Sequence, residues 1–365
     1  MKLFRASISF LKQNQFIWIR IQKIRSILRR MRSISFFIYD VKNSLYAMHW
    51  PVKQKCRSTL SAELVFQYHK LEKGLVMPGE KRMFGVNPAR ETMRLLLNWE
   101  DLEDGNISDP IYLAGIGTLQ CYMDHISAKG LDKKDTITSE VQLFLQKYSF
   151  QQKKYQTPSK KLTYFNPDEF EKLSLARRSV RNFSEKPVSR DTIISCFKTA
   201  QQAPSACNRQ PCSVKIISDP NLKLEILKYQ NGNKGFGHLA PSIAVITSNE
   251  KYFFGAIERH QPYIDGGLFS MSFILALQSN GISSCCLNWC VTPKDDKAVH
   301  KILNIESTER IIMYLAIGYA SDDIAVATST RRSSDSALDF KCLREPWVYK
   351  MKCKVLLCII YMCIV

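Results

Sequence analysis

The stretch Tyr263–Ser279 is the feature that most constrains how this chain can fold. It is apolar on nearly every side of a helix, and Asn280-Gly281 follows it as a stop signal. A helix of this kind cannot face water all round, so it has to be central in a domain or lie at a subunit interface. The sequence therefore predicts a globular domain built around one long, largely buried helix.

Short strand-like runs lie on both sides of this helix and alternate with helical patterns. The four predicted strands are Val214–Ile217, Ile243–Thr247, Ser283–Leu287 and Arg310–Ile317. Ser189 is the predicted N-cap of a helix that runs to about Gln202, and Pro293–Leu303 has the pattern of another helix. Strands separated by helices predict an α/β or α+β sheet domain over residues 166–340.

The rest of the chain divides by composition. The predicted segments are a basic amphipathic segment at 1–57, a helical region at 58–150, a polar linker at 151–165 and a tail at 341–365. In the helical region we expect helices at Ser61–Glu72, with Gly74 as its end, at Met93–Leu102 and at Ile111–Ile126. The tail ends in eleven apolar residues, too few to span a bilayer. It could be a docking arm, a membrane-dipping tail or an altered end of the reading frame.

The net charge of +19 is concentrated near the N-terminus, because residues 1–57 hold thirteen basic residues and one acid. The charge therefore belongs to one segment and does not indicate a nucleic-acid-binding fold. The sequence has no zinc-finger spacing and no aromatic RNA-binding motif. We expect no nucleic-acid partner.

The basic segment also carries a helical stripe of apolar residues. Its members, spaced four and three residues apart, are Ile17, Ile21, Ile24, Leu28 and Met31. Such a helix could lie on an anionic membrane surface, with its basic residues toward the headgroups. The alternative is that it packs its stripe on the rest of the protein and leaves a solvated basic face.

Several classes of protein are disfavoured. The twelve cysteines are irregularly spaced without a C-x-x-C pair, which is typical of a reduced, cytoplasmic protein. The N-terminus has no signal-peptide pattern, and no run of about 20 apolar residues predicts an ordinary membrane span. The motifs of dinucleotide and P-loop sites, the G-x-S-x-G elbow and metal-ligand spacing are also missing. We therefore expect no hydrolase triad and no metal site.

Two polar clusters remain in the predicted sheet domain. One is R-R-S-V-R at 177–181, and its guanidinium groups suit a phosphate or a solvated surface about equally well. The other is A-P-S-A-C-N-R-Q-P at 203–211, a connection between a helix and a strand that carries more hydrogen-bonding groups than a turn requires. We expect Arg209 to face solvent or a second subunit, and Cys207 to be a small apolar filler.

These clusters resemble the nitroreductase-like flavoproteins. The likeness covers about residues 167–335 and includes R-R-S-V-R-N-F, A-Q-Q-A-P-S-A-C-N-R-Q-P, D-G-G-L-F-S-M-S-F, L-N-W and L-A-I-G-Y-A in order, followed by T-R-R at 330–332. The resemblance implies an α+β fold, with a mostly antiparallel sheet surrounded by helices. It also implies FMN as cofactor and a homodimer with the flavin at the subunit interface.

The resemblance further implies which residues would contact the flavin. Arg177, Arg178 and Ser179 would take the phosphate and ribityl region, and Arg181 would lie near the pyrimidine edge. The full set of implied cofactor contacts is Arg177, Arg178, Ser179, Arg181, Pro204, Ser205, Asn208, Gln210, Leu287, Asn288, Arg331 and Arg332. Pro204 to Gln210 would come from the partner subunit, Leu287 and Asn288 would lie near flavin N5, and Arg331 and Arg332 would close on the phosphate. Asn233 and Lys234 match a further ring contact only loosely.

The implied activity is electron transfer from NAD(P)H through flavin N5 to a small-molecule acceptor. Quinones, nitro-compounds and sugar- or lipid-linked intermediates are the acceptor classes that we expect. No acid–base triad is needed, because the cofactor carries the hydride chemistry. Cys285, Cys286 and Cys290 lie near the implied N5 segment, and we expect them to be buried packing residues.

The upstream motif Y-H-K-L-E-K-G-L at 68–75 resembles an extension found beside nitroreductase-like domains in bacterial polysaccharide gene neighbourhoods. His69, Glu72 and Lys73 could face a substrate or the flavin, but an ordinary capped helix end with Glu–Lys pairs is the favoured explanation. The alternative function is therefore a flavin-free, membrane-peripheral accessory or binding protein of polysaccharide assembly. In either case we expect a cytoplasmic protein, with the option of attachment to the inner face of the membrane.

Overall fold

The computed structural model describes residues 15–48, 56–78, 82–134, 136–148, 164–322, 324–334 and 337–338. Its contacts divide the chain into two units, residues 1–326 and 327–365. The predicted tail at 341–365 lies outside the described residues, as does the predicted linker apart from residues 164 and 165.

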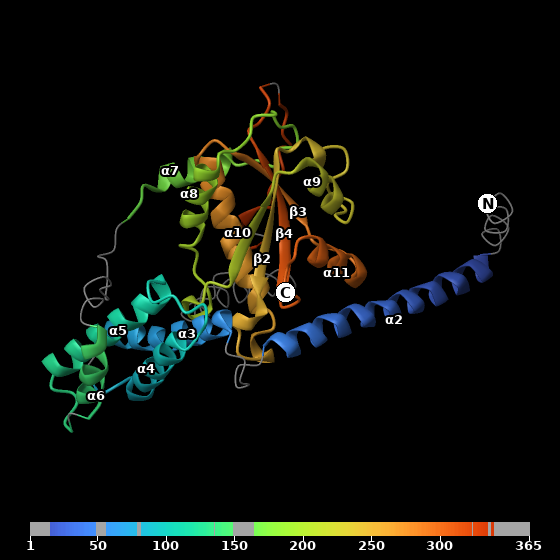
Figure 1. Cartoon of the computed structure of the whole chain (residues 1–365). Helices are drawn as coiled ribbons and strands as arrows, with labels where there is room; N and C mark the ends of the chain where they lie inside the picture. The colour runs from blue at the N-terminus through green and yellow to red at the C-terminus, as the bar shows by residue number, and fades with distance from the viewer. Residues whose placement is uncertain are drawn as a thin grey trace, which may run out of the picture. The chain divides into compact units, whose positions relative to one another are not determined.

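A four-stranded sheet forms the centre of the first unit (Figure 1). Its strands are β1 (Cys212–Ile217), β2 (Ser242–Asn249), β3 (Ser283–Asn288) and β4 (Glu309–Gly318). They are arranged in the order β1-β2-β4-β3, and every neighbouring pair is antiparallel. The α+β prediction is confirmed, and each predicted strand falls within an observed one.

Helices cover both faces of this sheet. They are α7 (Pro167–Ala176), α8 (Arg190–Ala200), α9 (Pro220–Leu227), α10 (Gln261–Ser279) and α11 (Pro293–Ile302). Figure 1 shows α8 and α10 together on one side, with α9 and α11 on the other. Phe273 of α10 packs with Ala244 and Leu315 on the first face, whereas Val245 and Tyr314 point to the opposite face and its separate core. This alternation follows from the two-residue period of a strand.

Short 3-10 turns connect the longer elements, one after α6 in the upstream helical region and the others in the sheet domain. They are η1 (Gln146–Tyr148), η3 (Ala206–Asn208), η4 (Gly237–Leu239), η5 (Glu250–Tyr252) and η6 (Ala256–Glu258). The predicted N-cap of α8 is confirmed, because the Ser189 hydroxyl accepts a hydrogen bond from the backbone N–H of Thr192 at 3.1 Å.

The region upstream of the sheet is helical and has a core of its own. Its helices are α3 (Arg57–Val76), α4 (Val86–Glu100), α5 (Pro110–Ala128) and α6 (Thr136–Leu145). Buried Leu64, Leu96 and Ile116 are part of that core. The prediction that Gly74 ends its helix is wrong, since α3 continues to Val76. A Cβ at position 74 would come 2.2 Å from the ring of Phe84, so close packing explains this glycine.

The N-terminal basic segment contains one long helix, α2 (Gln15–Ala47). Its C-terminal half contacts the sheet unit: the Tyr39 hydroxyl donates to the Asp296 carboxylate at 2.8 Å, and the Ser44 hydroxyl donates to Glu250 at 2.7 Å. None of the helices in the described part of the chain has the length and apolar composition that crossing a bilayer requires.

Candidate functional site

The arginine-rich segment 177–181 lies beside strand β3. The backbone N–H of Val180 donates to the carbonyl of Ser284 at 3.1 Å, and Ser179 forms a parallel bridge with Ser284. Val180 and Phe183 are buried in the core on that face, which fixes the segment on the sheet. Arg181 and Asn182, between these two anchors, are exposed.

The arginines of this segment have no carboxylate partner among the described residues. Arg178 donates to the carbonyl of Arg177 at 3.0 Å, and Arg181 donates to that of Ser179 at 3.4 Å. The Arg181 guanidinium also lies over the ring of Phe236, at 5.6 Å from its centroid. Guanidinium groups held by the backbone without a neutralising carboxylate are suited to bind an anion such as phosphate.

Strand β3 runs on from Ser284, where this segment pairs, to Leu287 and Asn288 at its end. Leu287 is buried and Asn288 is exposed, so the Asn288 side chain is available at the surface. The buried Gln230 amide donates to the Asn288 carbonyl at 2.9 Å and fixes the strand end. Gln230 is a residue of the candidate site that the sequence patterns did not indicate.

The three cysteines near this strand end differ in exposure. Cys285 is buried, as expected, but Cys286 and Cys290 are exposed, so the prediction of buried packing is wrong for these two. Successive side chains of β3 point to opposite faces of the sheet, which explains why Cys285 is buried and Cys286 is exposed. Burial raises the pKa of the Cys285 thiol, which keeps it protonated and poorly nucleophilic at neutral pH.

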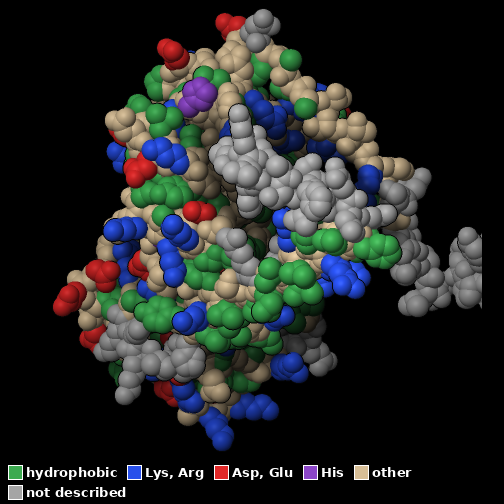
Figure 2. Space-filling model, turned by 90° about the vertical axis from the view of Figure 1, so that its right-hand side faces the viewer, with side chains coloured by type: hydrophobic (Ala, Val, Ile, Leu, Met, Phe, Trp, Pro, Cys, Tyr) green, Lys and Arg blue, Asp and Glu red, His purple; other side chains and the backbone are tan. Residues whose placement is uncertain are grey.

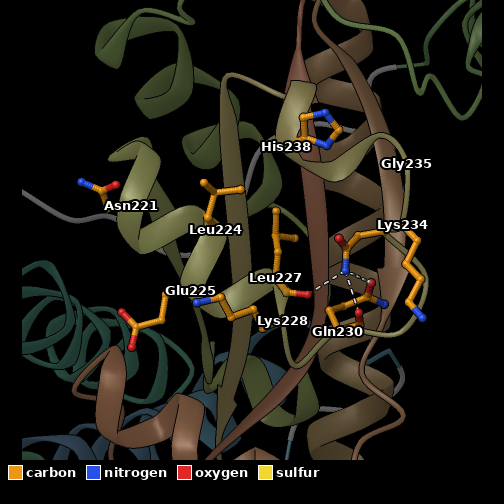
Figure 3. A pocket seen from close by; sticks show the side chains of 10 residues that line it. Asn221, Leu224, Glu225, Leu227, Lys228, Gln230, Lys234, Gly235 and His238 are labelled. Carbon is orange, nitrogen blue, oxygen red and sulfur yellow. Dashed lines mark hydrogen bonds between the residues drawn. The ribbon is translucent and has the colours of Figure 1, made fainter.

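A groove of about 680 Å³ lies between α9 and the η4 segment (Figure 3). Lys228, Lys234 and His238 contribute basic groups to its lining, and Glu225 contributes an acid. Its inner wall includes Gln230, which contacts Asn288. The groove therefore reaches the end of β3, whereas the arginine-rich segment pairs with Ser284 near the start of that strand.

The loosely matched Asn233 has an internal role in this groove. Its side-chain amide donates to the carbonyls of Leu227 and Gln230 at 2.8 and 2.6 Å, and to the Gln230 side chain at 3.1 Å. Figure 3 shows these bonds as dashed lines. Lys234 is exposed beside it. A ligand contact by the Asn233 amide would require at least one of these bonds to be exchanged.

The second polar cluster, residues 204–210, forms a tightly bonded loop between α8 and β1. The Ser205 hydroxyl accepts from the backbone N–H of Gln210 at 3.0 Å, and the Gln210 amide donates to the Asn208 carbonyl at 3.1 Å. The backbone N–H of Ala206 donates to the carboxylate of buried Asp265, on α10, at 3.0 Å. Pro204 and Asn208 are exposed, whereas Ser205 and Gln210 are half-buried.

Arg209 lies in the interior, and the prediction that it faces solvent or a second subunit is wrong. Its side chain is fully buried and forms a bidentate ion pair with Glu258, with nitrogen–oxygen distances of 2.5 and 3.0 Å. The rings of Phe66, Phe253 and Phe254 surround the guanidinium. These partners are distant in sequence from the loop, so local pattern alone gave no signal of the burial.

The two clusters are held against different elements of the chain. Residues 177–181 bond to β3, whereas the 204–210 loop bonds to α10 and to residues 252–258. Arg331 and Arg332 are exposed and belong to the second unit, where Arg331 donates to the carbonyl of Ser329. Among the described residues, no group of three His, Cys, Asp or Glu side chains could hold a metal ion.

Comparison with known proteins identifies the family of the sheet unit. The model of the family described as "Nitroreductase family" matches residues 175–233 and 223–319. The chain carries a nitroreductase-family oxidoreductase domain. Members of this family generally bind FMN, use NAD(P)H and form homodimers.

Individual relatives of this nitroreductase-family domain are distant. The chain is 23% identical to a 4-nitrobenzoate reductase of Pseudomonas putida over 218 residues, covering 47% of this chain and 94% of the relative. It is 29% identical to an iodotyrosine deiodinase of Thermotoga neapolitana over 175 residues, covering 41% and 88%. A solved nitroreductase family protein of Streptococcus pneumoniae superposes with a TM-score of 0.41 at 20% identity, covering 47% and 100%.

Proposed function

We propose that this protein is an FMN-dependent oxidoreductase that takes electrons from NAD(P)H and passes them to a small-molecule acceptor. The observation that carries the proposal is the arginine-rich segment 177–181. It is fixed beside Ser284, near the start of β3, in a nitroreductase-family domain, without carboxylate partners among the described residues. Bound FMN would supply the hydride chemistry, and the chain would supply binding, orientation and electrostatics.

The donor set of this segment fits FMN. Arg177, Arg178 and Ser179 would hold the phosphate and ribityl region through charge-assisted and neutral hydrogen bonds. Arg181, which the Phe236 ring supports, would place its positive charge at the pyrimidine edge. There a cation favours the reduced, anionic flavin.

The remaining predicted contacts complete the proposal. Leu287 and Asn288 would line the ring near N5, because they end the strand to which the arginine-rich segment bonds. Arg331 and Arg332 would bind the phosphate, a role that rests on the family pattern of the sequence.

A homodimer is part of the proposal, since residues 204–210 are held against other elements than 177–181. Pro204, Ser205, Asn208 and Gln210 would serve the flavin of the partner subunit. The α10 helix supports such an association, because one of its sides is exposed and apolar at Ile264, Leu268 and Met271. An exposed apolar helix face of this kind is typical of a protein–protein interface.

Absorption spectroscopy tests the cofactor assignment. We expect the purified full chain to be yellow, or to take up FMN with a micromolar or tighter dissociation constant. The double variant R178Q/R181Q should bind at least about tenfold more weakly, since charge-assisted hydrogen bonds contribute about 1.5–3 kcal/mol each. Exposed Arg190, at the start of α8, provides the matched control R190Q. A chain that stays colourless with added FMN would refute the proposal.

The acceptor is the open part of the activity. The names of the relatives point to nitro-aromatic and iodinated aromatic compounds. Quinones and sugar- or lipid-linked intermediates of polysaccharide metabolism are further candidates. A screen for flavin reoxidation after anaerobic reduction with NADH or NADPH would identify both substrates. Reoxidation by none of these classes would argue against an enzymatic role.

A second candidate function is attachment to an anionic membrane surface, with or without flavin, in polysaccharide assembly. Helix α2 favours it through an exposed apolar stripe at alternating spacings of three and four residues. The stripe consists of Ile24, Ile27, Met31, Ile34, Ile38, Val41 and Leu45. On the helical wheel this stripe lies opposite Asn43, which faces Arg310 of the sheet unit.

The charge of α2 distinguishes its possible partners. Its sequence contains seven basic residues and one acid, and Figure 2 shows hydrophobic and basic side chains next to each other on one face of the molecule. Parallel pairing of two α2 helices along the stripe would bring Arg20, which continues it, toward Arg20 of the other copy. Anionic lipid headgroups of a cytoplasmic leaflet neutralise this charge instead.

Vesicle sedimentation tests the attachment. We expect binding to vesicles that contain phosphatidylserine, weakening with salt, and no binding to phosphatidylcholine alone. The variant I27E/I34E should abolish binding, whereas I257E, at an exposed isoleucine outside α2, should retain it. Equal binding by I27E/I34E and the wild type would refute a role of the stripe.

A further inference from the structure

The loop 204–210 holds an unfavourable backbone conformation. Cys207, Asn208 and Gln210 have φ angles of 51°, 57° and 55°, in the left-handed region. None of them is a glycine, and side chains with a Cβ adopt this region at a cost in free energy. Surrounding contacts must therefore hold the loop in place.

Arg209 supplies many of these contacts. Its Nε donates to the carbonyl of Ala206 at 2.8 Å, within the loop itself. Its Nη1 donates to the carbonyl of Tyr252 at 2.8 Å, and both terminal nitrogens contact Glu258. One buried side chain thus ties the strained loop to the η5–η6 segment.

The upstream helical region closes the site around Arg209. Phe66 of α3 lies 5.9 Å from the guanidinium carbon and 5.8 Å from the ring of Phe254. The Lys70 ammonium covers the Phe66 ring at 3.9 Å. Neighbouring Val65 and Tyr68 instead point into the helical core, so α3 uses its other face to contact the loop.

We propose that Arg209 is a positioning residue for FMN and that Phe66 couples the helical region 56–148 to FMN binding. The inference rests on the proposed function, in which Ser205, Asn208 and Gln210 contact the flavin. Contact with α3 stabilises the strained conformation of the loop, and that conformation presents these side chains to FMN. By reciprocity, FMN bound against the loop stabilises the packing of α3 on Arg209. The helical extension then sets the cofactor affinity of the domain to which it is attached.

FMN titration of the full chain, followed by quenching of flavin fluorescence, tests this coupling. We expect R209K to weaken binding about fivefold to thirtyfold, the range of one desolvated cation–π contact, and F66L to weaken it about threefold to tenfold. The double variant F66L/R209K should lose less than the product of the two single effects, since the residues act through one contact. F170A, which removes an exposed phenylalanine of α7, is the control.

Hydrogen exchange gives a readout that is independent of activity. FMN should slow amide exchange in α3 of the wild type and of F170A, and should do so much less in F66L. The thermal unfolding temperature of apo F66L measures any general loss of stability. A variant that has the wild-type unfolding temperature but weaker FMN binding would support positioning over a structural role.

The possible failures are distinguishable. A wild-type chain that does not bind FMN would refute the proposed function. A wild type that binds FMN, together with an F66L variant of equal affinity and unchanged exchange in α3, would overturn the coupling while leaving the proposed function intact. Multiplicative effects of F66L and R209K would also overturn it.

Discussion

Gly266 of α10 lies directly against Ile312 of β4. A Cβ at position 266 would come 2.6 Å from Cγ1 and 2.8 Å from Cδ1 of Ile312. Isoleucine is a β-branched residue, so the χ1 rotamer that places Cγ1 is restricted in a strand. The glycine therefore allows the long helix to approach the sheet closely, which places Asp265 beside the 204–210 loop.

We predict that G266A destabilises the protein. Alanine is favoured over glycine within a helix by about 1 kcal/mol, but overpacking against Ile312 costs about 1–3 kcal/mol. The net loss should be up to about 2 kcal/mol, measured by urea unfolding. The loss should be smaller when Ile312 is also truncated. G266A/I312A should therefore lose less stability relative to I312A than G266A loses relative to the wild type. A G266A variant as stable as the wild type would show that β4 shifts at this position to accommodate the added methyl group.

The buried ion pair between Arg310 and Glu250 gives a second prediction. Their closest nitrogen–oxygen distance is 2.9 Å, and both residues are buried. The variant R310M leaves Glu250 as a buried, uncompensated charge, so we expect a loss of about 3–5 kcal/mol. At the surface, R94M removes the exposed pairs of Arg94 with Glu63 and Glu91 and should change stability by less than about 1 kcal/mol.

Asp265 gives a prediction of pH dependence. Burial raises the pKa of its carboxyl in the folded protein. The folded state therefore retains the proton to higher pH than the unfolded chain, in which an aspartate has a pKa of about 3.9. As the pH rises from there through the raised folded pKa, the wild type loses stability.

The variant D265N should not show this loss. Its side-chain oxygen can still accept from the Ala206 N–H, while the Gln261 amide, which now donates to Asp265 at 2.8 Å, has to rotate. We expect the unfolding free energy of D265N, relative to the wild type, to rise with pH above about 4 and then level off. D104N, at an exposed carboxyl, is the control. A constant difference across pH 4–8 would contradict the raised pKa.

Local sequence signals predicted much of the sheet unit. The Ser189 cap, the apolar helix at Tyr263–Ser279 and the four short apolar runs depend on nearest neighbours and periodicity, and all are confirmed. Those signals are local, because capping and amphipathic patterning arise within a few turns of chain. The twelve implied cofactor contacts remain predictions, although the structure does place 177–181 beside β3.

The interior position of Arg209 could not be predicted in the same way. Arginine is seldom fully buried, and burial here depends on Glu258 and on rings from two distant segments. Gly74 is similar, since Phe84 packs where a side chain would otherwise lie. In both cases the deciding partner is brought near by tertiary packing, which local composition does not encode.

Arg181 gives the prediction that tests the electrostatics of the proposed flavin site most directly. Its guanidinium lies over Phe236 and has no carboxylate partner among the described residues. At the pyrimidine edge it would stabilise the reduced, anionic flavin more than the oxidised, neutral one. The variant R181Q should therefore lower the midpoint potential of bound FMN by about 30–60 mV, which is one to two factors of ten in a two-electron equilibrium. Equilibration with a reference dye during anaerobic reduction measures the shift, and R190Q should leave the potential unchanged. An unchanged potential in R181Q, with FMN still bound, would place this arginine away from the ring.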